Sequence, residues 1–316
     1  MSEVLMVAKK VILIVGPTGS GKTALSIKIA QRFNGECINA DATQIFNGLN
    51  LATNKVTPSE QVGIPHHLLS TIDLNDNYSI KMYQQQGRKI LAQLWNKNKI
   101  PIVVGGSGLY INALLKNYQF SDQGRDLLKT KEYEHVSNYA LWEKLATIDP
   151  QESTKIHPNN RKRVWRALEY YLQTGILKSS NDHHRNEWYI EPYIIGLLPD
   201  KAELHQYLFD RVLRLTEQGL FAEIEAAYKY CNYDLTKQSM KIIGCSEIIR
   251  YLKGELSYEA TLAAMVQANK FYAKKQITWF KHQLTNVHWY SFSYSQFDNL
   301  CQKIIVELKN SNYLKL

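Results

Sequence analysis

The chain has 316 residues, 45% of them hydrophobic, which is enough for one large domain or for a core with an insertion. No apolar run approaches the roughly 18 residues that a membrane-spanning helix needs. The apolar run after Lys9 and Lys10 is too short for a signal peptide, so we expect a cytoplasmic protein with no membrane partner. The net charge of +9 favours a polyanionic partner, with nucleic acid the first candidate.

The cysteines form no C-x-x-C pair and lie near no histidine at zinc spacing. Reduced, buried thiols and no zinc site are therefore expected. The four cysteines are Cys37, Cys231, Cys245 and Cys301.

Short apolar runs alternate with amphipathic segments in the first third of the chain. Strands are expected at 11–15, 36–41 and 100–106, and helices at 24–33, 78–98 and 108–115. The continuous apolar run VILIV is typical of a central parallel strand, and the alternation predicts βαβ units. The helix at 78–98 is expected to bury an apolar face made of Met82, Ile90, Leu91 and Leu94.

The pattern changes after Lys116, where the sequence becomes polar and helical without a clear buried strand. A helix at 159–175 ends at the stop signal Gly175, and PYIIGLLP (192–199) then restores a buried strand. The remainder, 200–316, reads as mostly helical. We therefore predict an α/β fold: a P-loop type parallel sheet core flanked by helices, with a helical insertion domain. The core would comprise 1–115 and 192–316, and the insertion 116–191.

The segment GPTGSGKT (16–23) satisfies the pattern G-x-x-x-x-G-K-[ST] between an apolar strand and an amphipathic helix. Its glycines let backbone N–H groups turn toward one anion, which the helix N-terminus also favours. Lys22 adds a charge, and the Thr23 hydroxyl can hold Mg²⁺. The residues expected to bind phosphate are Gly16, Pro17, Thr18, Gly19, Ser20, Gly21, Lys22 and Thr23.

Nucleotide hydrolysis is disfavoured, because such enzymes hold Mg²⁺ with an acid at the end of a buried strand. The third predicted strand ends in VVGGSG, without an acid, and the run before Asp73 is interrupted by Ser70 and Thr71. The loop is therefore expected to hold a diphosphate that leaves, rather than one that donates a phosphoryl group.

Asp41 follows the second predicted strand at its carboxyl end, the edge where open α/β sheets bind ligands. The phosphate loop and GGSG (105–108) end at the same edge. We therefore expect three loops to converge, carrying Lys22 and Thr23, Asp41, and Ser107. The alternative is that Asp41 is only a turn or capping residue.

Several segments together resemble one family over nearly the whole chain, from about Val11 to about Trp289. They are GPTGSGKT, INADATQIFNGLNLATNKVT, GIPHHLL, PIVVGGSGLYINALL, IHPNNRKRVWRALEYY and AKKQITWFK. In this order they resemble the tRNA dimethylallyltransferases, also called tRNA isopentenyltransferases, of bacterial type. The combination is specific, whereas the phosphate loop alone would not be.

The resemblance implies transfer of a dimethylallyl group from dimethylallyl diphosphate to N6 of the adenine 3′-adjacent to the anticodon, position 37, in tRNAs reading UNN codons. It implies Mg²⁺ as cofactor and a monomer acting on the anticodon stem-loop. Asp41 matches the general base, Thr23 assists at the diphosphate, and Arg211 contacts it. The residues that match tRNA-contacting regions are Asp41, Ala42, Thr43, Gln44, Ser107, Lys162, Arg163, Val164, Trp165 and Arg166.

The physical chemistry agrees with these roles. The amine becomes acidic only as it attacks carbon, so a carboxylate of ordinary basicity can remove the proton in place. The target base must leave its stack to be reached, which calls for an RNA-binding platform. Arg163, Arg166 and Tyr170 recur at helical spacing and share one face. That face can follow phosphates, or it can be an ordinary solvated face with Trp165 in the core.

A second basic segment, NKFYAKKQITWFKHQ, interleaves lysines with aromatic residues. It is compatible with RNA contact and equally with a packed amphipathic helix.

Several positions depart from the family pattern, namely Ala42, Ala52, Tyr207, Cys245 and Ser246. Tyr207 stands where many members have arginine, so weaker binding of tRNA or donor is expected. Three alternatives remain open: an adenylate (cytokinin-type) isopentenyltransferase, a tRNA-binding homologue with impaired catalysis, and a small-molecule kinase. The helical insertion and the QITWFK segment favour tRNA over a free nucleotide.

Overall fold

The computed structural model describes residues 9–118, 120, 133, 135–181 and 187–314. Contacts divide the chain into two compact units. The core unit comprises Met1–Leu115 and Ile190–Leu316, and the insertion unit comprises Lys116–Tyr189. Within the described residues, no helix is both long and apolar enough to cross a membrane.

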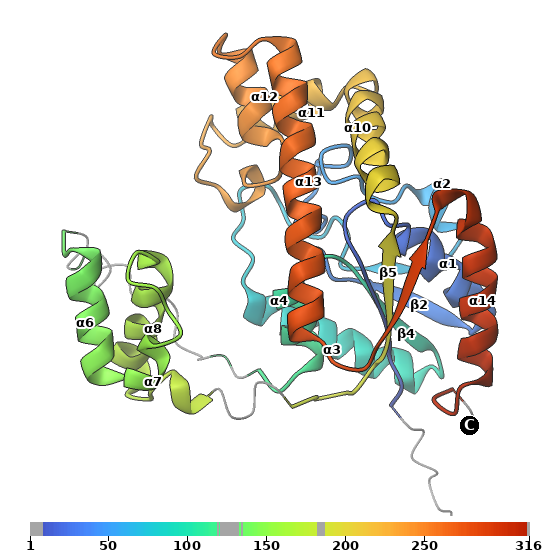
Figure 1. Cartoon of the computed structure of the whole chain (residues 1–316), viewed down its shortest axis with the longest axis horizontal. Helices are drawn as coiled ribbons and strands as arrows, with labels where there is room; N and C mark the ends of the chain where they lie inside the picture. Colours follow the sequence, from blue (N-terminus) through green and yellow to red (C-terminus); the bar gives the residue numbers. More distant parts are fainter. Residues whose placement is uncertain (1–8, 119, 121–132, 134, 182–186, 315–316) are drawn as a thin grey trace, which may run out of the picture. The chain divides into compact units, whose positions relative to one another are not determined.

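The core unit is built on a sheet whose strands all pair in parallel, in the order β3-β2-β4-β1-β5-β6 (Figure 1). The predicted parallel α/β fold is confirmed. β1 is central and completely buried, as its apolar run requires. The strands are β1 (Ile12–Val15), β2 (Gly35–Asn39), β3 (His66–His67), β4 (Ile100–Val104), β5 (Tyr193–Pro199) and β6 (Val287–Phe292).

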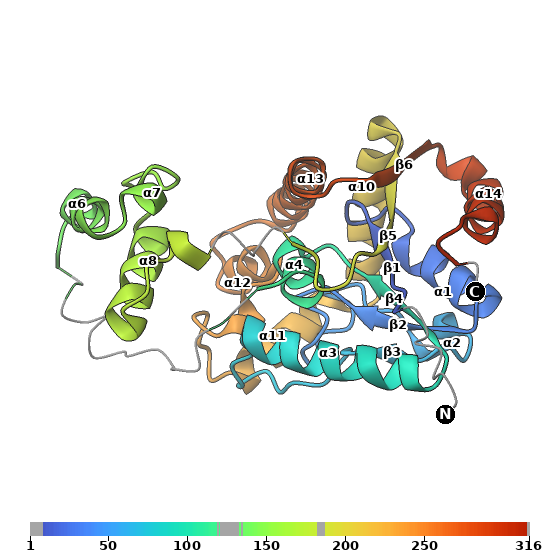
Figure 2. The same cartoon turned by 90° about the horizontal axis from the view of Figure 1, so that it is seen from below.

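Helices cover both faces of this sheet, with α1 and α14 on one face and α3 and α4 on the other (Figure 2). In Figure 1 the helices α10, α11 and α12 lie beyond the carboxyl ends of β5 and β6, and α13 runs back along the sheet to the start of β6. The helices of this unit are α1 (Lys22–Arg32), α2 (Pro58–Gln61), α3 (Ile80–Asn96), α4 (Gly108–Leu115), α10 (Lys201–Glu217), α11 (Leu220–Tyr230), α12 (Cys245–Leu252), α13 (Tyr258–Gln283) and α14 (Phe297–Asn310). Short 3₁₀ turns lie at Gln238–Met240 and Tyr294–Gln296.

Two details differ from the sequence-based expectations. β6 was missed because VHWYSF is a half-exposed edge strand that lacks a continuous apolar run. In α3 the expected apolar face is confirmed at Leu91 and Leu94, which are buried, whereas Ile90 is half-buried, Met82 is 39% exposed and Tyr83 is buried instead. Tyr83 fits there because its hydroxyl donates to the Asn39 carbonyl at 2.9 Å, which satisfies the polar end of a buried ring.

The insertion unit contains α6 (Asn138–Ile148), α7 (Pro150–Ser153), α8 (Arg161–Thr174) and a 3₁₀ turn at Ser179–Asn181. α6 and α8 pack together over a small apolar core that includes Leu141, Leu145, Val164, Trp165 and Leu168. α8 ends where expected, because Gly175 caps it with a φ of +69°.

All four cysteines of the chain are free and buried, as predicted.

The loops after β2 and β4 approach so closely that Gly105 has no room for a side chain. A Cβ on Gly105 would lie 2.3 Å from the backbone carbonyl of Ala40. A Cβ on Gly87 in α3 would meet only the tip of the Leu114 side chain, at 2.7 Å. Backbone cannot yield as a flexible side chain can.

We therefore expect Gly105→Ala to lower the free energy of unfolding by about 2–3 kcal/mol. The matched change Gly87→Ala should alter it by less than about 1 kcal/mol, since alanine is the better helix former. Urea denaturation of both variants checks this. Equal losses would contradict the close approach of the two loops.

Candidate active site

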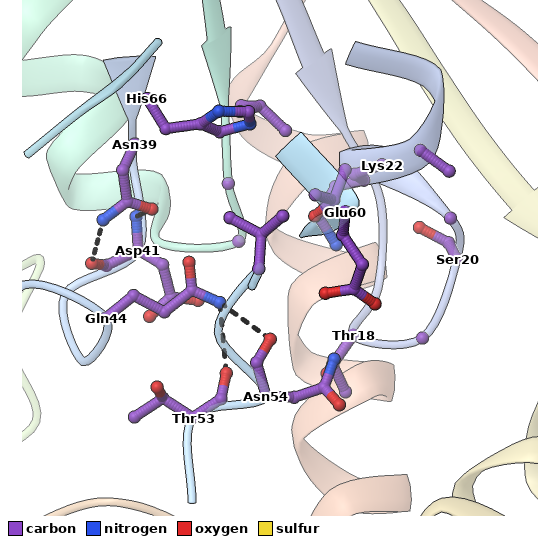
Figure 3. Close-up of a pocket in the computed structure, with 18 of the residues that line it drawn as sticks. Thr18, Ser20, Lys22, Asn39, Asp41, Gln44, Thr53, Asn54, Glu60 and His66 are labelled. Atoms are coloured by element: carbon purple, nitrogen blue, oxygen red, sulfur yellow. Dashed lines mark hydrogen bonds between the residues drawn. The ribbon is translucent and has the colours of Figure 1, made fainter. Parts of the chain in front are cut away.

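A cavity of about 380 Å³ lies at the carboxyl edge of the sheet, where the loops after β1, β2 and β4 end (Figure 3). The phosphate loop lines it together with Asp41, Gly105 and Gly106. The expected convergence of loops is therefore found for Lys22, Thr23 and Asp41. Ser107 lies beside them, but its hydroxyl accepts the Ala42 N–H at 3.0 Å and does not line this cavity.

The phosphate loop adopts a conformation that only its glycines allow at two points. Gly19 has a φ of +85° and Gly21 a φ of +79°, both in the left-handed region. The first residues of α1, Lys22, Thr23 and Ala24, line the cavity, so the unpaired N–H groups of this helix end lie at its wall. This arrangement suits an anion.

The Lys22 ammonium folds back onto the loop and donates to the carbonyls of Gly16 at 3.0 Å and Pro17 at 2.7 Å. Burial lowers the pKa of Lys22 to about 8, the Asp41 carboxylate opposes this shift, and Arg211 adds to it. Lys22 is therefore still charged at neutral pH and has no carboxylate partner among the described residues.

Arg211 reaches the same cavity from α10 and is 6% exposed. Its guanidinium donates to the Thr18 hydroxyl at 2.9 Å and to the Asn269 side chain, while its buried Nε has no hydrogen-bond partner. Burial lowers the pKa of Arg211. A buried guanidinium in the wall of a cavity is suited to an anionic ligand.

Asp41 lies two residues beyond β2, where it stabilises a turn and also lines the cavity. Its Oδ1 accepts the Thr43 N–H at 2.9 Å and the Thr43 hydroxyl at 2.7 Å. Asn39 holds the Asp41 backbone from both sides, at 3.1 Å each. No hydrogen bond to Oδ2 is found among the described residues, so one carboxylate oxygen is fixed and the other is available.

Sequence reasoning missed the role of Gln276 in α13, which is 5% exposed. Its Oε1 accepts the Thr18 N–H at 2.7 Å, and its Nε2 donates to the Gly106 carbonyl at 3.1 Å. Gln276 therefore joins the phosphate loop to the loop after β4. The segment QITWF was recognised, but no spacing rule links it to a loop more than 250 residues earlier.

A second cavity of about 170 Å³ adjoins the first, because Thr18, Asp41 and Arg211 line both. Much of its other wall is apolar, formed by Val212, Leu215, Leu220, Ile242 and Met265. Asp41 and Arg211 thus stand between a side lined by the phosphate loop and a side lined by aliphatic groups. Such a pair of compartments can hold a molecule with an anionic end and a short apolar end.

The segment that follows Asp41 is anchored by Glu223 of α11. The Glu223 carboxylate accepts the N–H groups of Asn50 and Leu51 at 2.9 Å and of Ala52 at 2.8 Å. Gln44 ties the same segment together by donating to the Thr53 carbonyl at 3.1 Å (Figure 3). Residues 52–54 line one or both cavities.

The tRNA-contact prediction for α8 divides into two groups. Lys162, Arg163 and Arg166 are exposed, so their predicted contact stays open. Val164 and Trp165 are buried in the core of the insertion unit, at 0% and 8% exposure. Their predicted contact is corrected, because an amphipathic helix turns its apolar face inward and leaves only its charged face for a ligand.

The departures from the family pattern fall in different places. Tyr207 lines the larger cavity, and Ala52 lines the smaller one. Cys245 is buried at the start of α12, and the exposed Ser246 hydroxyl donates to Glu247 at 2.8 Å. Neither Cys245 nor Ser246 lines either cavity.

Comparison with known proteins identifies a family. The family model described as IPP transferase matches residues 44–283. A tRNA dimethylallyltransferase of Staphylococcus epidermidis is 39% identical over 288 residues, which is 88% of this chain and 85% of that protein. One from Oceanobacillus iheyensis is 38% identical over 309 residues, 94% and 96% of the two chains.

Solved structures agree with the sequence comparisons. The tRNA isopentenylpyrophosphate transferase of Bacillus halodurans superposes with a TM-score of 0.72 at 32% identity, over 95% of this chain and 96% of that chain. A eukaryotic dimethylallyltransferase acting on tRNA superposes with a TM-score of 0.86 at 29% identity, over 96% of this chain and 79% of that one.

The pKa of Lys22 leads to a pH prediction for anion binding. With a pKa of about 8, Lys22 is charged below that pH and neutral above it. We expect the affinity for inorganic diphosphate to fall by up to about tenfold between pH 7 and pH 9, as the charged fraction falls to about one-tenth. Isothermal titration calorimetry measures it. Lys22→Met should bind weakly at all pH values, and parallel profiles for the two proteins would contradict the assignment.

The Glu223 anchor is tested by Glu223→Gln, which removes the charge that three N–H groups share. We expect the free energy of unfolding to fall by about 1–3 kcal/mol, the range for hydrogen bonds to a charged group. Amide exchange at residues 50–52 should accelerate. Glu225→Gln, an exposed position on the same helix, is the control. Equal effects of the two changes would contradict the anchor.

Proposed function

This chain belongs to the IPP transferase family and is a prenyl-transferring enzyme, and we propose that it transfers a dimethylallyl group from dimethylallyl diphosphate to tRNA. The acceptor is N6 of the adenine 3′-adjacent to the anticodon, position 37, in tRNAs reading UNN codons. The product is N6-dimethylallyladenosine. We place the enzyme in the cytoplasm because its substrate is tRNA, and we propose separately that it acts as a monomer.

One observation carries the assignment of the donor site. The cavity lined by the phosphate loop and the smaller cavity beside it, whose wall is partly aliphatic, share Asp41 and Arg211. Dimethylallyl diphosphate has the matching division, with a charged diphosphate at one end and a five-carbon apolar group at the other. The bond that breaks joins these two ends, and Asp41 and Arg211 lie where the two compartments meet.

The diphosphate gathers negative charge as it leaves, and the chain offers positive groups to meet it. Lys22 can turn from the carbonyls of Gly16 and Pro17 toward the anion, and the Arg211 guanidinium lies in the wall of the same cavity. Once the bound anion holds these groups in place, they need little further reorganisation during the reaction, which is the basis of electrostatic catalysis.

Mg²⁺ fits this site as a cofactor held mainly by the donor. Among the described residues, no three histidine, cysteine, aspartate or glutamate side chains come together as a metal site. Mg²⁺ is typically held by one or two protein oxygens together with phosphate oxygens and water. The Thr23 hydroxyl at the cavity wall is the oxygen that we assign to it. When bound, the ion adds positive charge at the leaving diphosphate.

Asp41 is the proposed general base. As the N6–C bond forms and the C–O bond to diphosphate breaks, the amine nitrogen becomes positive and gives one proton to Oδ2 of Asp41. The two bonds from Thr43 hold Oδ1, so the base keeps its direction. Its carboxylate also lowers the energy of the cationic nitrogen before the proton moves.

The net positive charge of the chain and the names of its relatives support tRNA as the acceptor. The adenine must leave its stack to reach a cavity, so the enzyme must hold the surrounding stem-loop. The exposed Lys162, Arg163 and Arg166 of α8 are assigned to its phosphates, with Ala42, Thr43, Gln44 and Ser107 near the base. An adenylate isopentenyltransferase would need no such platform, and a kinase would need a strand-end acid.

Isotopic transfer tests the proposal directly. The purified chain is incubated with labelled dimethylallyl diphosphate, Mg²⁺ and either unmodified tRNA reading UNN codons or free AMP. We expect label in tRNA, and we expect Asp41→Asn to lower the rate by roughly 10²–10⁴, the usual contribution of a general base. Label in AMP alone would assign the cytokinin-type activity. Tight tRNA binding without label in either acceptor would leave a tRNA-binding homologue without catalysis.

A further inference from the structure

The segment that follows β6 packs against the outer side of the phosphate loop. The Tyr294 hydroxyl donates to the Gly19 carbonyl at 2.9 Å. The Phe297 ring occupies the space beside Gly21, where a Cβ would lie 2.4 Å from it. Both left-handed glycines of the loop are therefore covered by aromatic residues, and Tyr294 and Phe297 come from the last 25 residues of the chain.

Helix α10 supports the same loop with three residues spaced four apart, which lie on one helix face. Glu203 accepts the Tyr294 N–H and the Ser293 hydroxyl, each at 2.8 Å. Tyr207 stacks on Tyr294 with centroids 5.1 Å apart and an angle of 14°, and its ring lies 3.0 Å from where a Gly19 Cβ would be. Arg211, the third, donates to the Thr18 hydroxyl.

These contacts fix the direction of one peptide group in the loop. The peptide between Gly19 and Ser20 turns its carbonyl outward to Tyr294 and its N–H toward the Pro17 carbonyl, at 3.2 Å. A carbonyl oxygen that faced the site would repel an anion bound there. Gly19 lacks the Cβ that would restrict its backbone, so an external partner has to restrict it. Burial raises the pKa of Tyr294, so its hydroxyl remains a donor at neutral pH.

We propose that Tyr294 is a positioning residue for the donor site: its hydroxyl holds the Gly19 carbonyl away from the anion, while Tyr207 clamps the ring of Tyr294 and the Cα of Gly19 in place. The inference rests on the proposed function for the identity of the anion, the donor diphosphate. Position 294 lies beyond the segment matched by the family model, which ends at residue 283.

The test removes one hydroxyl and keeps every ring. Tyr294→Phe should raise the Kd for inorganic diphosphate in Mg²⁺ buffer, and the KM for dimethylallyl diphosphate, by about two- to tenfold, the effect of one lost hydrogen bond. The KM for tRNA and the rate at saturating donor should stay within twofold. Tyr290→Phe is the matched control, because this tyrosine of β6 donates at 2.6 Å to Glu307, away from the loop.

The outcomes separate clearly. Unchanged diphosphate affinity in Tyr294→Phe, or an equal loss in Tyr290→Phe, overturns the positioning role. So does a lowered melting temperature without a change in anion binding, since that is the mark of a purely structural contact. Tyr207→Ala provides a second readout. The Kd for inorganic diphosphate and the KM for dimethylallyl diphosphate should rise while the KM for tRNA stays unchanged. A raised KM for tRNA with unchanged donor constants would contradict the role of Tyr207 in holding Tyr294 and Gly19.

Failure of the proposed function is distinguishable from failure of this inference. If the wild-type chain transfers no label to tRNA but binds inorganic diphosphate, the diphosphate arm still tests Tyr294 by itself. If the wild-type chain transfers label and Tyr294→Phe matches it in both donor constants, the function stands and the positioning role is rejected.

Discussion

Two cations, the half-buried Lys22 and the buried Arg211, share one cavity, and neither hydrogen-bonds to a carboxylate among the described residues. Charges in such a place destabilise the folded chain unless polar groups or a ligand meet them. Here loop carbonyls, a hydroxyl and an amide take that role in the absence of an anion. The site is therefore arranged to gain from a diphosphate, and α10 and α13 have to pack closely to keep it shielded.

The sequence predicted those parts of the site in which neighbouring residues act together. The phosphate loop is eight consecutive residues between a strand and a helix, and Asp41 follows the next strand directly. Gln276 and Tyr294 escaped prediction because each acts on the loop across more than 250 residues, and only tertiary packing brings them there. The edge strand β6 was not predicted for a related reason. Its sequence lacks a continuous apolar run, and it is its pairing with β5 that makes it a strand.

Helical faces were predicted less well than helix positions. Met82 was expected on the apolar face of α3, but helical spacing places Tyr83, and not Met82, on the side of Leu91 and Leu94. The Asn39 carbonyl then accepts the hydroxyl of the buried tyrosine. In α8 the sequence motif predicted tRNA contact for Val164 and Trp165 together with the neighbouring lysine and arginines. An amphipathic helix, however, turns its apolar side chains to the core and its charged side chains to the other face. A motif marks a segment, whereas burial decides which of its side chains can meet a ligand.

Tyr207 shows how a departure from a family pattern can be accommodated. An arginine at this cavity wall would add a third positive charge beside Lys22 and Arg211, where burial and, to a lesser degree, Arg211 already lower the pKa of Lys22. The tyrosine removes that charge and instead packs on Tyr294 and Gly19. This packing restricts the loop before an anion binds, and a preorganised site has less conformational freedom to lose on binding.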